Sequence, residues 1–239
     1  TLFLFALGTL YSVTGTLNMA DLAVRVAEIP AEDTALLRVG AVMLLLVFAI
    51  KAAVIPLHFW LPASYANAPL PIAALFAIMT KVGAYAILRM YTLVFGPDFA
   101  TTEGLAGAWL MPAALVTLMI GAIGILGSYR IGRLVAFGAI TSMGTLLTAI
   151  ALFSPEGVAA ALYYTLHSTL AAAFLFLVAD LISERQGIEI TAQRLMPQSG
   201  LIAVLFFTGA IAKMARADLR CGHAAGQLTR ARRLAQGRK

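Results

Sequence analysis

Long apolar runs separated by short polar breaks dominate the chain. An α-helix crosses the roughly 30 Å hydrocarbon core of a bilayer with about 17 to 25 apolar residues, and its backbone groups are satisfied internally. Seven segments have this character: Thr1–Leu17, Ala35–Trp60, Pro71–Phe95, Trp109–Ser128, Arg133–Phe153, Gly157–Ile182 and Gly200–Met214. The pattern predicts an all-α, polytopic bundle of about six to seven membrane helices.

Composition excludes a soluble enzyme. The chain is 61% hydrophobic and 12% charged, with a mean hydropathy of +0.91, whereas soluble domains carry about 25% charged residues. The single cysteine, Cys221, cannot form an internal disulfide, and no Cys/His cluster suggests zinc. We therefore expect no cofactor and no metal site, and translocation in place of enzymatic bond-making chemistry.

The formal net charge of +6 belongs to the C-terminal end of the chain. From Lys213 onward there are eight of the 17 Lys and Arg residues but one of the 11 Asp and Glu residues. The rest of the chain is nearly neutral, so nucleic acid is not an expected partner. We predict a membrane domain over residues 1–212 and a basic tail over 213–239 that is foreign to the domain before it. The alternative is a basic tail that binds anionic lipid headgroups.

Two lysines occur within apolar segments, where a central charge costs about 2.5 to 3.5 kcal/mol on insertion scales. Lys51 follows ten apolar or small residues, and Lys81 lies ten residues after Pro71 and fourteen before Phe95. A buried lysine can exchange a proton near neutral pH, which an arginine cannot. We interpret both as members of a proton or ion path and expect them to line one internal cavity. A structural ion pair or a lysine that extends to the interface is the alternative.

Two histidines are further candidates for this path. His58 lies seven residues after Lys51, on nearly the same helical face if the helix continues through Pro56; an interfacial histidine beside Trp60 is the alternative. His167 lies in the middle of its segment and titrates closest to neutrality of all side-chain types. A hydrogen-bonded core histidine is the alternative there.

The stretch Lys51–Pro62, with the sequence KAAVIPLHFWLP, and the stretch Thr80–Tyr85, with TKVGAY, resemble the antiporter-like subunits shared by complex I and the Mrp (Pha) multisubunit cation/proton antiporters. Within that superfamily, Gly15–Leu22 and Leu162–Ile182 resemble the D subunit of the Mrp/Pha antiporters. The resemblance covers about residues 1–212. It implies a fragment of a fourteen-helix subunit that contains inverted repeats.

The resemblance also assigns roles to residues. Lys51 matches the lysine of a broken seventh helix, with Pro56 and Pro62 marking the helix break. Lys81 matches the central lysine of the eighth helix, and His167 matches the histidine of the eleventh. The family further implies a glutamate on the fifth helix and an ionisable residue on the twelfth, and this sequence matches neither.

The resemblance implies a subunit of a monovalent cation/proton antiporter in the cell (inner) membrane. Its expected partners are other subunits of the complex, membrane lipid, protons and Na⁺ or K⁺. One alternative is a proton-pumping subunit of complex I or of a related membrane hydrogenase. Another is a truncated fragment that does not transport.

Overall fold

The computed structural model describes residues 1–30, 34–95, 107–186 and 200–211 of the chain, and these residues form helices and the turns between them. The all-α prediction is confirmed for this part, and each of the seven predicted segments contains a helix. The tail over residues 213–239 lies outside the described residues. The helices are α1 (Leu2–Thr14), α2 (Met19–Glu28), α3 (Ala35–Lys51), α4 (Trp60–Asn67), α5 (Leu70–Leu93), α6 (Gly107–Leu126), α7 (Ile131–Ala151), α8 (Pro155–Gln186) and an unlabelled helix over Gly200–Ile211.

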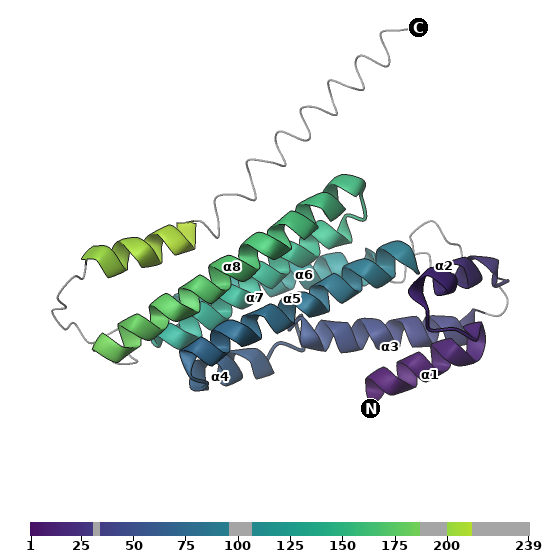
Figure 1. Ribbon diagram of the computed structural model, residues 1–239, viewed down its shortest axis with the longest axis horizontal. Coiled ribbons are helices and arrows are strands. Elements are labelled where there is room, and N and C mark those ends of the chain that lie inside the picture. The colour runs from purple at the N-terminus through teal and green to yellow at the C-terminus, as the bar shows by residue number, and fades with distance from the viewer. Residues whose placement is uncertain (31–33, 96–106, 187–199, 212–239) are drawn as a thin grey trace, which may run out of the picture.

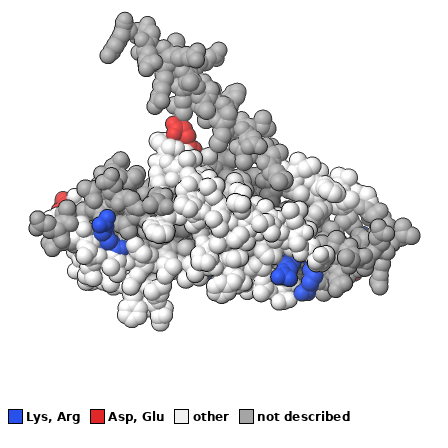
Figure 2. Space-filling view, turned by 180° about the vertical axis from the view of Figure 1, so that it is seen from behind, with Lys and Arg blue, Asp and Glu red and all other residues white. Residues whose placement is uncertain are grey.

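Four helices, α5 to α8, are long and apolar enough to cross a membrane, and α1 with α2 would form a fifth span with a 56° bend. The outward surfaces of these helices are rich in exposed leucine, isoleucine, valine and phenylalanine. Figure 2 shows one face of the molecule on which Lys, Arg, Asp and Glu lie toward the edges and the middle carries none. A surface without charges over its middle suits contact with hydrocarbon, and with the four long apolar helices it makes the chain a multi-pass membrane protein.

The helices pack in a continuous series (Figure 1). α1 packs on α3, α3 on α5, α5 on both α7 and α8, and α7 on α6 and α8, while α4 contacts α5 and α7 at one end of the bundle. Glycine permits the closest of these approaches. A Cβ added at Gly144 of α7 would lie 2.5 Å from the backbone nitrogen of Leu118 in α6, so these two helices pack almost backbone to backbone, as membrane helices with small residues do.

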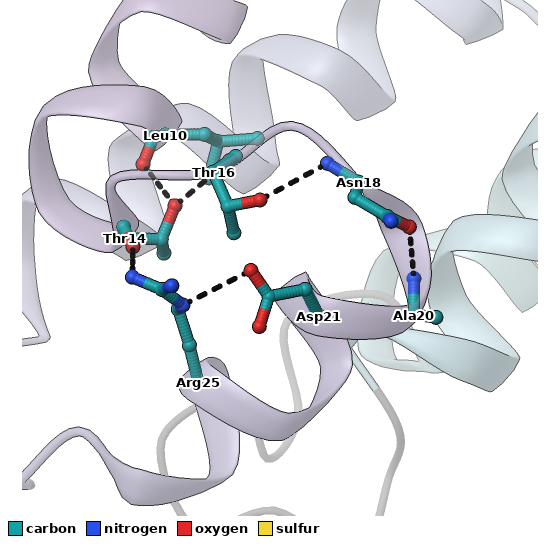
Figure 3. Close-up of polar contacts among 7 residues, drawn as sticks. All are labelled: Leu10, Thr14, Thr16, Asn18, Ala20, Asp21 and Arg25. Atoms are coloured by element: carbon teal, nitrogen blue, oxygen red, sulfur yellow. Dashed lines mark hydrogen bonds and ion pairs between the residues drawn. The ribbon is translucent and has the colours of Figure 1, made fainter.

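The bend between α1 and α2 is built from local hydrogen bonds (Figure 3). α1 ends at Gly15, which adopts the left-handed conformation with φ 71°, and Asn18 caps the first turn of α2 with its side chain. Arg25 of α2 donates to the carbonyl of Thr14 at 2.8 Å and pairs with Asp21 at 3.2 Å. The guanidinium therefore satisfies a carbonyl that the end of α1 leaves free.

The apolar segment Ala35–Trp60 is interrupted in its second part. α3 ends at Lys51, and residues 52–59 form a series of turns before α4 begins. Pro56 explains the break, because its ring nitrogen cannot donate to a helical carbonyl and its ring disfavours helix in the preceding residue. Pro62 lies in the first turn of α4, where a missing N–H costs nothing, so it does not interrupt a helix.

Candidate functional site

Lys81 lies in the middle of α5 and is the buried cation of the described bundle, with 3% of its surface exposed. Its Nζ donates to Ser142 Oγ at 2.7 Å and contacts Met143 Sδ at 3.3 Å, both on α7. Ser142 donates its own proton to the carbonyl of Ala139 at 2.7 Å. That bond orients a lone pair of the serine oxygen toward the ammonium.

The two α7 partners of Lys81 are neutral groups. A hydroxyl and a thioether bind an ammonium less strongly than a carboxylate would, because charge-assisted pairs are the strongest hydrogen bonds. The neighbouring α5 residue Thr80, which is fully buried, donates to the carbonyl of Ala77 at 2.9 Å. This arrangement accommodates the Lys81 ammonium within the bundle.

Lys51 occupies a different environment. It is the last residue of α3 and its side chain is exposed. A Cβ added at Gly83 of α5 would lie 3.0 Å from Lys51 Cβ, so the end of α3 crosses α5 at Gly83. Gly83 and Lys81 are two residues apart and project about 200° from each other around the helix. In the described part of the chain Lys51 is exposed whereas Lys81 is buried, and both the shared cavity and the role of Lys51 in translocation stay predictions.

His58 lies in the turns between α3 and α4, so the condition for sharing a helical face with Lys51 is not met. Its backbone carbonyl accepts from the amide of Leu61 at 3.0 Å. The side-chain nitrogen Nδ1 is buried without a hydrogen-bond partner among the described residues. A buried imidazole nitrogen of this kind has the capacity to bind water or a proton, which is compatible with the predicted relay role without testing it.

His167 lies on α8 and stacks on Tyr163, with ring centroids 6.5 Å apart and an interplanar angle of 8°. It borders an open pocket of about 370 Å³ between α8 and the helix over Gly200–Ile211, whose lining residues are His167, Leu170, Ala171, Phe174, Thr208 and Gly209. Lys81 contacts Ser142 and Met143 on α7, and α8, which carries His167, packs on both α5 and α7.

Sequence reasoning missed two hydroxyls. Ser142 accepts from Lys81, and Thr117 of α6 accepts from the backbone amide of Ile55 at 3.1 Å. The available signal was a hydroxyl within an apolar run, since Thr117 is the only residue between Gly107 and Leu126 with a hydroxyl, amide or charged side chain. Among the described residues no group of three His, Cys, Asp or Glu side chains could hold a metal.

Comparison with known proteins identifies the family to which the chain belongs. The model of the NADH:quinone oxidoreductase/Mrp antiporter transmembrane family matches residues 1–219. The chain belongs to this family. The resemblance noted in the sequence is confirmed, and the predicted end of the family-like domain at residue 212 stays a prediction.

Individual relatives agree. The chain is 43% identical over 187 residues to a Bacillus subtilis protein named as the D subunit of an Na(+)/H(+) antiporter, a match that covers 78% of this chain and 37% of the relative. It is 40% identical over 181 residues to a Rhizobium meliloti protein named as the probable D subunit of a K(+)/H(+) antiporter, with 76% and 34% coverage. The chain thus spans about a third of the length of the curated relatives that it matches.

A solved structure shares the fold. A chain in the structure of the Mrp complex from Dietzia sp. DQ12-45-1b is 31% identical and superposes with a TM-score of 0.74, over 88% of this chain and 38% of that one. The described helices therefore share the fold of a chain in that complex.

Proposed function

We propose that this chain is part of the D subunit of a multisubunit monovalent cation/proton antiporter in the cell membrane, and that Lys81 loads and releases the transported proton. The carrying observation is the burial of the Lys81 ammonium on α5 against Ser142 and Met143 of α7. A buried intramembrane charge is expensive to maintain, and function is its default explanation. The names of the antiporter relatives support the same function.

In this proposal the chemistry is proton transfer without covalent bond making. The protonated Lys81 donates to Ser142 Oγ, and loss of the proton weakens that contact, so that the ammonium and the free amine favour different side-chain positions. Lys51 precedes the turns between α3 and α4, His58 lies within them, and His167 borders the pocket on α8. These groups extend the path on either side of Lys81, while Na⁺ or K⁺ moves in the opposite direction together with partner subunits.

Exchange in inverted membrane vesicles tests the role of Lys81. The chain is expressed in its native gene context in a host without other sodium or potassium/proton antiporters, and a pH-sensitive dye reports proton release after addition of Na⁺ or K⁺. Lys81→Met and Lys81→Arg should both abolish exchange, because methionine carries no proton and arginine does not release one. Met79→Leu, on the exposed side of the same helix, is the matched control and should retain the native rate.

The same assay separates the alternatives. Native exchange in the Lys81→Met vesicles would refute the proton-loading role. Proton movement that follows electron transfer and ignores added cations would favour a complex I-like pump. A native chain that assembles in the membrane and exchanges no cation would favour the non-transporting fragment.

A further inference from the structure

The turns over residues 52–59 separate α3 from α4 and contain both Pro56 and His58. Most of their backbone amides bond within the same stretch of chain: the amides of residues 52, 53, 54 and 57 donate to the carbonyls of Phe48, Ile50, Ala49 and Val54 at 2.6–3.1 Å. The amide of Ile55 is different. It donates to the side chain of Thr117, 62 residues later in the chain, at 3.1 Å.

Thr117 is suited to this contact by its position on α6. The side chain is fully buried, and its hydroxyl donates to the carbonyl of Ala113, one turn earlier in the same helix, at 2.6 Å. With its proton committed to Ala113, the oxygen presents a lone pair to Ile55. A threonine can fill both roles, whereas an isosteric valine can fill neither.

The amide of Ile55 has few alternative hydrogen-bond acceptors. Because the following residue is Pro56, the backbone at Ile55 is disfavoured from returning to helix, so an i−4 carbonyl cannot readily replace Thr117. The two residues before it, Ala53 and Val54, are buried, whereas Ile55 is half-buried and Pro56 is exposed. The hydroxyl is thus the tertiary acceptor for an amide that the break itself leaves free.

We propose that Thr117 is a positioning residue that fixes the 52–59 turns and thereby sets the places of Lys51 and His58. The effect of Thr117 on transport rests on the proposed function, whereas its hydrogen bond to the turns does not. Lys51 lies four residues before Ile55 and His58 three residues after it. The hydrogen bond between Ile55 and Thr117 therefore restrains the backbone next to both residues, although Thr117 itself contacts neither the proton nor the cation.

Hydrogen–deuterium exchange on the assembled membrane complex tests the anchor directly. In Thr117→Val, amide exchange in the peptide that contains Ile55 should accelerate at least tenfold, and Thr117→Ala should agree. Thr117→Ser keeps the hydroxyl and should remain near native. Thr148→Val is the matched control, because Thr148 of α7 also donates to the carbonyl one turn earlier, that of Gly144. Unchanged exchange in both Thr117→Val and Thr117→Ala would overturn the proposal.

Cation-dependent proton exchange in vesicles tests the consequence. We expect Thr117→Val to lower the rate at least fivefold and to change its pH profile, with Thr117→Ser restoring both. A faster amide exchange with an unaltered rate and pH profile would overturn the positioning role. Failure of the proposed function has a separate signature, since Lys81→Met would then retain transport whatever the amides near Ile55 do.

Discussion

The two intramembrane lysines occupy opposite kinds of structure. Lys81 lies within a continuous helix of 24 residues, buried against a second continuous helix. Lys51 ends a helix of 17 residues, exposed beside a set of turns. The first is held by side chains of α7, whereas the segment after the second is held by one threonine of α6.

This difference concerns how each ammonium is stabilised. In the interior of α5 the backbone groups bond within the helix, so side chains must solvate the charge, and Ser142 does so. At Lys51 the C-terminal end of α3 carries the negative end of the helix dipole, which favours a cation, and the exposure of the side chain leaves room for water or a partner. Lys81 therefore depends on packing, and Lys51 depends on the geometry of the break.

The largest expected effect is at Gly83, where the two regions meet. A Cβ there would lie 2.8 Å from the backbone nitrogen of Ala52, so Gly83→Ala should displace the end of α3 and lower the free energy of unfolding by about 3 kcal/mol, as overpacking does. Gly8→Ala is the control, because nothing lies within 4 Å of its added Cβ. It should stabilise α1 by up to ~1 kcal/mol. Unfolding in mixed micelles measures both, and equal effects would contradict the close crossing.

Lys81→Met should raise stability while it abolishes transport. Methionine has a similar length and removes the buried charge, whose insertion costs about 2.5 to 3.5 kcal/mol, so we expect a gain of about 2 kcal/mol. Ser142 keeps its bond to Ala139, so its hydroxyl proton still has an acceptor. Lys51→Met should change the unfolding free energy by less than about 0.5 kcal/mol, as exposed sites do. Equal changes in unfolding free energy for Lys81→Met and Lys51→Met in the same assay would contradict the difference in burial between the two lysines.

Ser142→Ala should destabilise the bundle by about 1.5 kcal/mol, because it removes the hydroxyl that solvates the Lys81 ammonium. It should also slow cation-dependent proton exchange. Ser12→Ala is the matched control, since exposed Ser12 likewise donates to a carbonyl three residues earlier, that of Thr9, at 2.8 Å. Thermal unfolding of the purified complex, together with vesicle transport, measures the pair. A Ser142→Ala protein as stable and as active as Ser12→Ala would exclude Ser142 as a partner of Lys81.

The smallest effect concerns the other side of the break. Trp60 Nε1 donates to the carbonyl of Ile50 near the end of α3 at 3.0 Å, so Trp60→Phe should lower stability by about 1 kcal/mol. Ile50 still accepts from Ala53, which limits the loss. Trp109→Phe changes a tryptophan that is 73% exposed and should have no measurable effect. Equal unfolding midpoints for the two variants would argue against a role for this bond.

Much of the fold was predictable because a bilayer imposes strong rules on sequence. A span needs a long apolar run, so the seven runs predicted where helices form. The break at Pro56 could also be predicted. Its extent could not, because α3 already ends at Lys51, five residues before the proline, and turns cover residues 52–59. The short helices α2 and α4 were missed. Neither has the length or the continuous apolar character of a span.

By itself, the sequence determined that the chain is a helical membrane protein, that Lys81 lies at the centre of a span and that Pro56 interrupts a helix. It also carried the motifs of the family. Each of these follows from local composition or from proline geometry. The tertiary structure alone decided that α7 contacts α5 at Lys81 and that α3 contacts it on the opposite side, at Gly83. It also decided that Ser142 binds the Lys81 ammonium and that Thr117 binds the amide of Ile55 in the break. Such contacts join residues about 60 positions apart, and helix packing brings them together in a way that no local pattern records.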